Sequence, residues 1–213
     1  MTTVNKKFTL IELLVVIAIM GILASLLLPA LGKARETAQQ AVCKSQQKQL
    51  GVAIYLYVED NEYMPSASHA TKSSRLGWKV HIGPYINSSG DGEEGGSAPF
   101  RCPLSEVVTG SPNQESGTAY NIRMGDDRYD ARPAVRLDDI ESPVQTGVLA
   151  DSVDSTDWAI ASKLLPSEDA VGYRHKNGLN ILWADGHVQW FTTVAIQAGK
   201  NGAPDWYYEV IKP

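Results

Sequence analysis

Four side chains in the C-terminal half of the chain are of the types that bind metals or move protons. Asp151 ends one β-prone run, and the other three residues precede, lie in the turn of, or follow the turn of a predicted hairpin. Folding can bring the four residues together if the hairpin lies beside that run. They are Asp151, His175, Asp185 and His187. Carboxylates and imidazoles in one cluster would bind a metal or act as acid and base. The interpretation that we favour is structural, with Asp185 setting a turn and both histidines hydrogen-bonding loop backbone at the sheet edge.

Two acidic stretches, "SSGDGEEGGSAP" from Ser88 and "DSVDSTD" from Asp151, are further metal candidates. Neither has the alternating oxygen ligands of a calcium loop, so we interpret both as solvated segments. No serine or cysteine stands in a nucleophile motif such as GxSxG. We therefore expect no enzymatic activity, no cofactor and no resident metal.

The two cysteines, Cys43 and Cys102, belong to no CxxC pair, which argues against a zinc or thioredoxin-like site. In a domain outside the cytoplasm they are candidates for a disulfide. Closing a loop of about 60 residues would stabilise the fold by roughly 4 kcal/mol. The alternative is a pair of unrelated buried thiols.

The chain carries a formal net charge of −5 over 213 residues. An acidic chain has no general electrostatic footprint for nucleic acid, so we expect no nucleic-acid partner. About 180 residues remain beyond the N-terminal apolar stretch, which is enough for one domain with its own core.

Near the N-terminus, Glu12 interrupts an otherwise continuous apolar run. No charged residue occurs from Leu13 to Leu31, and such a helix would be about 28 Å long, close to the thickness of the hydrocarbon layer. An unpaired carboxylate in lipid costs roughly 2.5 kcal/mol or more, so Glu12 calls for a partner.

Three kinds of N-terminal segment fit this pattern. A cleaved signal peptide has a basic start and an apolar core, with a cut after Gly32, but its core is shorter and lacks a carboxylate. A plain membrane anchor explains the length and leaves Glu12 unexplained. The third kind is a prepilin signal.

The stretch "KFTLIELLVVIAIMGILASLLLPAL" resembles the N-terminus of type IV prepilins and type II secretion pseudopilins. The resemblance implies cleavage by a prepilin peptidase between Lys7 and Phe8, followed by N-methylation of Phe8. It matches Glu12 and Pro29 to the family's glutamate and helix-breaking proline. Lys7 departs from the family, which usually has glycine before the cut.

This resemblance divides the chain into a leader (residues 1–7), a transmembrane and fibre-core helix (8–32) and a periplasmic head (33–213). The cation implied for Glu12 is the terminal amine of Phe8 in a neighbouring subunit, and this pair would set the axial register of a fibre. Pro29 is expected to bend or locally melt the helix. The N-terminus would be cytoplasmic, in a single-pass inner-membrane topology.

Helical periodicity continues after the apolar stretch, so we predict one helix over residues 8–61, bent near Pro29. Its second half would pack through Val42, Leu50 and Ile54, interrupted by a polar segment at residues 45–49. Strands are predicted at residues 119–122, 147–150, 179–184 and 187–191. Asp185-Gly186 predicts a type I′ turn between the last two. The predicted fold is α+β: a long helix packed on a small antiparallel sheet.

A second resemblance lies in "RHKNGLNILWADGHVQWF", where nine residues separate His175 from Asp185-Gly186. It is similar to the C-terminal signature of a pilin-like family in some Gram-negative bacteria. Other matching segments are Cys43, Gln49-Leu50-Gly51, Tyr57, Phe100-Arg101-Cys102-Pro103 and Ala119-Tyr120-Asn121.

Both resemblances imply a structural subunit that joins other pilin-like subunits in a type II secretion pseudopilus or a type IV pilus-like fibre. Its expected partners are the prepilin peptidase, the inner membrane and the secretion or pilus assembly machinery. The alternative is a membrane-anchored periplasmic protein that binds a ligand or metal and uses a prepilin export signal.

Overall fold

The computed structural model of the chain describes residues 9–66, 77–86, 99–104, 117–121, 124–125, 134–152 and 174–195. The chain divides into two compact units, Met1–Ala38 and Gln39–Pro213. Helix α1 (Leu10–Asn61) begins in the first unit and ends in the second. Lys7, Phe8, the loop after Ser88 and most of the acidic stretch after Asp151 lie outside the described residues, so the predictions made for them stay predictions.

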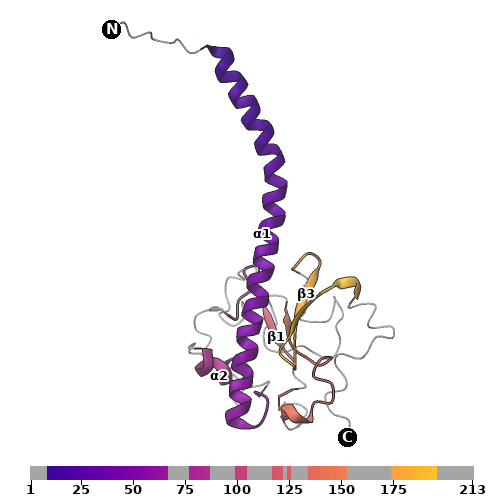
Figure 1. The fold of residues 1–213 in the computed structure, drawn as a ribbon. Coiled ribbons are helices and arrows are strands. Elements are labelled where there is room, and N and C mark those ends of the chain that lie inside the picture. The colour runs from indigo at the N-terminus through magenta and orange to yellow at the C-terminus, as the bar shows by residue number, and fades with distance from the viewer. Residues whose placement is uncertain are drawn as a thin grey trace. The chain divides into compact units, whose positions relative to one another are not determined.

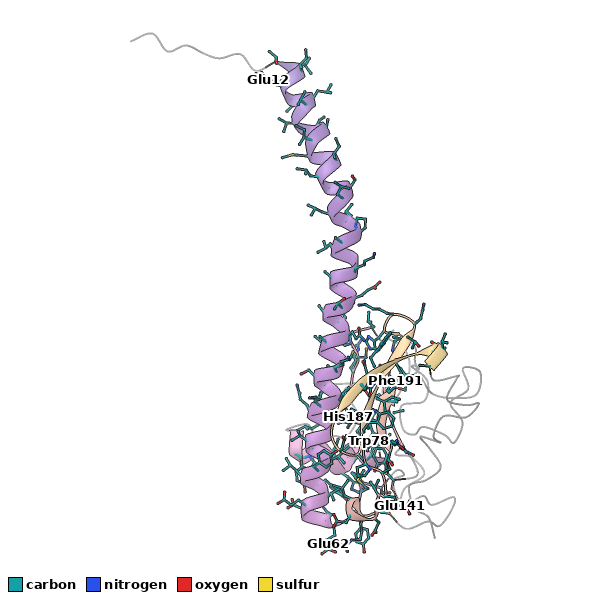
Figure 2. All side chains as sticks on the ribbon, turned by 45° about the vertical axis from the view of Figure 1, so that its right-hand side comes forward. Glu12, Glu62, Trp78, Glu141, His187 and Phe191 are labelled. Carbon is teal, nitrogen blue, oxygen red and sulfur yellow. The ribbon has the colours of Figure 1, made fainter. Side chains whose placement is uncertain are left out.

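The first unit consists, in its described part, of the start of α1 and the residue before it. Every residue from 9 to 38 is exposed, including the apolar side chains that project from the helix in Figure 2. Within the described residues, α1 is the one helix that is long and apolar enough to cross a membrane. Pro29 lies inside the helix without interrupting it, so of the two predicted effects, a bend or local melting, local melting does not occur.

The second unit holds a four-stranded sheet in the order β1-β2-β3-β4, with every neighbouring pair antiparallel. Figure 1 shows the sheet beside the second part of α1, which confirms the predicted α+β, pilin-like arrangement. The strands are β1 (Thr118–Tyr120), β2 (Gly147–Asp151), β3 (Gly178–Trp183) and β4 (Val188–Thr192). In the chain, the short helices α2 (Gly77–Ile82) and η1 (Gly83–Ile86) follow α1 and precede β1, and η2 (Leu137–Asp139) lies between β1 and β2.

The hydrophobic core of this unit forms where α1 packs on the sheet. Gly51 permits the close approach, because a Cβ there would lie 3.0 Å from Leu182 Cδ2 on β3. The Tyr55 hydroxyl donates a 2.8 Å hydrogen bond to the carbonyl of Ala184. Val42 is 46% exposed, so its predicted place in the core was wrong. The buried members of the core are Leu50, Ala53, Ile54, Met64, Trp78, Ile82, Phe100, Tyr120, Met124, Val135, Ile140, Val148, Leu149, Leu182 and Ala184.

The β3–β4 hairpin has a three-residue loop rather than the predicted type I′ turn. Gly186 N–H donates to the Trp183 carbonyl at 2.9 Å, and Trp183 N–H donates to the His187 carbonyl at 2.9 Å. Gly186 has a φ of 87°, whereas Asp185 is not among the positive-φ residues. A three-residue loop of this kind is a type I turn followed by a left-handed glycine in a bulge, so only the glycine needs a positive φ. A type I′ turn would need a positive φ at both central residues.

Two residues at positive φ occur instead at the opposite end of β3. Lys176 (53°) and Asn177 (56°) form a two-residue turn closed by paired hydrogen bonds between His175 and Gly178. The backbone carbonyl of His175 also accepts a 2.8 Å hydrogen bond from Trp190 Nε1 on β4. This turn fixes where the His175 side chain enters the interior of the unit.

Candidate functional site

Glu12 has a partner within its own helix end. Its carboxylate Oε2 accepts hydrogen bonds from the Thr9 backbone N–H at 2.8 Å and from the Thr9 hydroxyl at 2.9 Å. In return, the Glu12 N–H donates to Thr9 Oγ1 at 3.3 Å. This reciprocal arrangement is a capping box, which satisfies the free N–H groups at the start of a helix. The sequence pattern Thr-x-x-Glu before an apolar run is typical of a capping box, so the local partner of Glu12 could have been predicted from the sequence.

The capping box explains why a carboxylate can stand at this helix start, but it supplies no positive charge. Both Thr9 and Glu12 are exposed, so the negative charge remains available to a cation from outside the described residues. The apolar side chains that follow are uncovered as well. This unit therefore needs lipid, or further copies of itself, to remove its apolar surface from water.

The main polar cluster of the second unit is fully buried and joins side chains from four separate segments. Cys43 lies on α1, Cys102 in the segment 99–104, Asp151 at the end of β2, and His175 before β3. The two sulfurs are 2.6 Å apart, Cys102 Sγ is 3.4 Å from His175 Nε2, and the same nitrogen is 3.4 Å from Asp151 Oδ2. Each of the four residues is no more than 2% exposed.

Asp151 is held by further hydrogen bonds from two elements. Gln47 Nε2 on α1 donates to its Oδ1 at 3.0 Å. The backbone N–H and the side-chain amide of Asn180 on β3 donate to its Oδ2 at 2.7 and 3.0 Å. Gln47 belongs to the segment predicted to be a polar interruption of the helix face, but it is buried and hydrogen-bonds the helix to the sheet. The signal in the sequence was a polar residue, Gln47, at a position of the helix that faces the core, which indicates a buried hydrogen-bond partner.

The charges in this cluster depend on one another. Burial raises the pKa of Asp151 to about 7, despite the opposing charge of His175 and the hydrogen bond from Asn180. Burial by itself lowers the pKa of His175, but the hydrogen bond with Cys102 and the charge of Asp151 outweigh it and raise that pKa overall. The surroundings therefore favour the protonated forms of both the carboxyl group and the imidazole.

The two thiols of the reduced pair differ in acidity. The hydrogen bond from Cys43 and the contact with His175 lower the pKa of Cys102 to about 4, against the opposing effect of burial. The same Cys43–Cys102 hydrogen bond, together with burial, raises the pKa of Cys43. The reduced pair is thus one thiolate and one thiol.

Two chemistries fit such a cluster, and a third does not. Cys43, Cys102 and His175 offer ligand atoms that all lie within 4.8 Å of one another, as a soft metal requires. The two sulfurs can also form a disulfide. A hydrolytic triad does not fit, because Cys102 and Asp151 face the same imidazole nitrogen, whereas a triad uses both nitrogens.

Asp185 and His187 form a separate pair on the β3–β4 hairpin. Asp185 Oδ1 accepts a 3.1 Å hydrogen bond from the His187 N–H and lies 2.5 Å from His187 Nδ1. Asp185 thus sets the turn, as predicted. The four residues considered together from the sequence fall into two sites, and the prediction that the His175 side chain bonds loop backbone was wrong.

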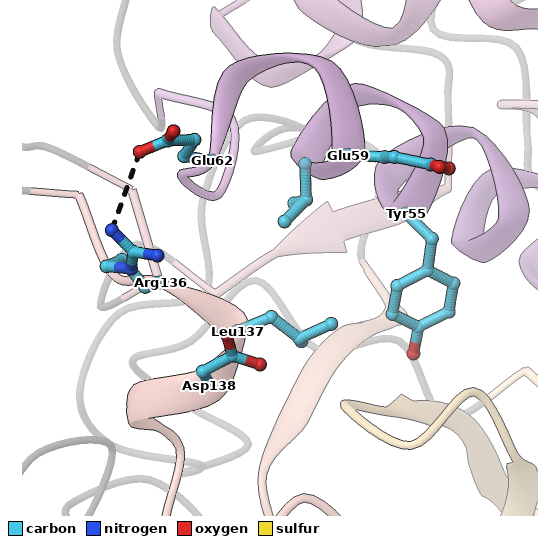
Figure 3. Close-up of a pocket in the computed structure, with 7 residues that line it drawn as sticks. Tyr55, Glu59, Glu62, Arg136, Leu137 and Asp138 are labelled. Carbon is cyan, nitrogen blue, oxygen red and sulfur yellow. Dashed lines mark hydrogen bonds and ion pairs between the residues drawn. The ribbon is translucent and has the colours of Figure 1, made fainter.

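A surface pocket of about 320 Å³ lies where the end of α1 meets η2 (Figure 3). Arg136 Nη1 is 3.5 Å from Glu62 Oε2 across its rim, and both side chains are well exposed. Exposed ion pairs of this kind contribute little to stability. The other lining residues are Tyr55, Val58, Glu59, Leu137 and Asp138.

A family model described as "Protein of unknown function (DUF1559)" matches residues 32–94. No curated protein and no solved structure matches the chain. The match begins after the apolar stretch and ends before β1, so it includes Cys43 but neither His175 nor Asp185-Gly186. Over this part, less than a third of its length, the chain is similar to a family associated with pilin-like proteins that carry a prepilin-type signal.

Proposed function

We propose that this protein is a non-enzymatic, pilin-like subunit that assembles into a type II secretion pseudopilus or a type IV pilus-like fibre. The observation that carries the proposal is the uncovered apolar part of α1, which starts with a single carboxylate and ends before a self-contained head. A prepilin peptidase would cut between Lys7 and Phe8 and methylate the new amine. The head would lie on the periplasmic side of the inner membrane before extraction into the fibre.

The capping box sharpens the role of Glu12 in this proposal. Cleavage before Phe8 leaves Thr9 and its backbone N–H in place, so the box can persist in the mature subunit. The Phe8 amine of a neighbouring copy would then add the positive charge that the box lacks. Capping orders the end of the helix, and the charge pair between copies sets the register.

The mature N-terminus tests the proposal directly. Intact-mass and N-terminal peptide analysis of the protein from membranes is expected to find a chain that begins at Phe8 and carries one methyl group. A chain that begins at Lys33 would identify a cleaved signal peptide and end the proposal. A chain that keeps residues 1–7 would mean that Lys7 blocks processing, and the protein would be a plain anchor.

A further inference from the structure

The paired sulfurs of Cys43 and Cys102 play no part in anchoring or fibre register. They lie in the head, with their sulfurs 2.6 Å apart. One of the two, Cys102, also touches His175, which in turn contacts Asp151. The arrangement therefore places an imidazole and a carboxyl group on one side of two closely spaced sulfurs.

We propose that Cys43 and Cys102 form a thiol–disulfide exchange site, and that His175 favours its reduced form by holding the Cys102 thiolate. A disulfide has its sulfurs 2.03–2.05 Å apart, so the sulfurs need to move by about half an ångström. Two thiolates on one tetrahedral zinc, with bonds of about 2.3 Å, would stand about 3.8 Å apart. The geometry thus favours a disulfide over the metal that the same ligands would otherwise suit.

The contacts of Cys102 determine which form of the pair is favoured. In the reduced form its thiolate accepts a hydrogen bond from the Cys43 thiol and lies 3.4 Å from His175 Nε2. In the disulfide both interactions with a thiolate are lost. Interactions made in one redox form alone shift the equilibrium toward that form, which makes the disulfide easier to reduce.

The charged and titratable groups around the thiolate come from each surrounding segment. His175 precedes β3 and is favourable to the Cys102 thiolate, as is a backbone N–H at Leu104. The charge of Arg174 lowers the pKa of Cys43. Asp151 on β2 opposes the Cys102 thiolate when ionised, but burial keeps the pKa of Asp151 near 7. The lowered pKa of Cys102 agrees with this balance.

The exchange conserves atoms and electrons. The Cys102 thiolate attacks one sulfur of an external disulfide, such as oxidised glutathione, and the other sulfur of that molecule leaves as a thiolate that takes a proton from water. Cys43 then loses its proton and attacks Cys102, which releases the second thiol. The chain, which starts as one thiolate and one thiol, loses one proton and two electrons. The external disulfide takes up these two electrons, that proton and one proton from water, and becomes two thiols. Burial of both sulfurs slows these steps but leaves the equilibrium unchanged.

The equilibrium of this pair with glutathione tests the proposal in the detergent-solubilised full-length chain. Acid quenching, alkylation and mass spectrometry give the fraction of disulfide at each glutathione ratio. His175→Gln is expected to raise the equilibrium constant for disulfide formation at least tenfold, equivalent to about 30 mV. His187→Gln, the same substitution in the exposed Asp185 pair, should leave it within about twofold.

A purely structural His175 would destabilise both redox forms alike, so an unchanged equilibrium constant in His175→Gln overturns the proposal. One stoichiometric zinc in the isolated protein, or thiols that stay free in excess oxidised glutathione, would also overturn it.

A second measurement does not depend on how the His175 variant folds. Reduced wild-type protein should show one thiolate in ultraviolet absorbance near neutral pH, and Cys102→Ser should lose it. Absence of that thiolate in the wild type contradicts the proposal. The result is independent of fibre formation, so failure here and failure of the proposed function are distinguishable.

Discussion

Glu12 and Asp151 are two carboxylates placed among apolar residues, and the two units of the chain accommodate them in different ways. Glu12 is exposed, and its partner is Thr9, three residues earlier in the chain. Asp151 is 1% exposed and is held by Gln47 and Asn180, which lie 104 and 29 residues away in sequence. One carboxylate is satisfied locally, and the other by the tertiary fold.

This difference explains what each unit requires from its surroundings. The head satisfies its buried carboxylate and covers its core with its own segments. The described part of the first unit covers none of its apolar side chains and leaves the charge of Glu12 without a cation. The head should therefore fold independently of assembly, whereas the first unit should acquire its stability from lipid and from other copies.

The largest effect should come from removing the buried carboxylate. Asp151→Ala leaves the donors of Gln47 and Asn180 and the imidazole of His175 without their partner, which should lower the free energy of unfolding by roughly 3–5 kcal/mol. Urea unfolding in detergent, followed through the fluorescence of the buried Trp78, measures it. Glu12→Ala is the matched control and should change that value by less than about 0.5 kcal/mol. An equal loss of unfolding free energy in Asp151→Ala and Glu12→Ala would show that the two units do not differ in how they accommodate a carboxylate.

The pH dependence of stability should also come from the head. Burial raises the pKa of Asp151 from 3.8 to about 7, so the folded head keeps a proton that the unfolded chain releases. The stability linked to this proton is fully present below about pH 4 and is lost as the pH rises through about 7. His175, whose pKa is also raised, acts in the same direction above its ordinary value of 6.5.

Between pH 5 and 7 we therefore expect the free energy of unfolding to fall by about 2 kcal/mol. Asp151→Asn removes the titrating carboxylate at nearly constant size and should flatten this dependence. Urea unfolding of both proteins at the two pH values checks it. A variant that keeps the full slope would show that other groups carry the proton.

Two glycines of α1, one in each unit, should differ in their effect on the stability of the head when replaced by alanine, and the effect is smaller than that of Asp151→Ala. A Cβ at Gly51 would lie 3.0 Å from Leu182 Cδ2, so Gly51→Ala should cost about 1–2 kcal/mol of head stability through overpacking. Gly21 has nothing within 4 Å of that position, so Gly21→Ala should leave head unfolding unchanged. Assembled copies that pack closely at Gly21 would make the same substitution impair the fibre. A loss of head stability in Gly21→Ala would contradict the independence of the two units.

Local patterns in the sequence predicted the helix and all four strands, because hydrophobic periodicity and turn residues are properties of neighbouring positions. The same patterns missed the position of Gln47, since a buried amide is understood only once Asp151 and Asn180 stand opposite it. The contact between Cys102 and His175 likewise depends on tertiary packing. The turn at Asp185-Gly186 was placed correctly and its type was not, because a bulge depends on the register of both strands.

The role of Glu12 in assembly is the central claim, and two conservative variants separate its charge from its capping hydrogen bonds. Glu12→Gln keeps a side chain that can complete the capping box but removes the charge, whereas Thr9→Ala weakens the box by about 1 kcal/mol and keeps the charge. The measurement is recovery of ordered fibres, by electron microscopy, from cells with the intact assembly machinery. We expect Glu12→Gln to lose ordered fibres and Thr9→Ala to retain them. Normal fibres from Glu12→Gln would contradict the account and leave Glu12 as a helix cap.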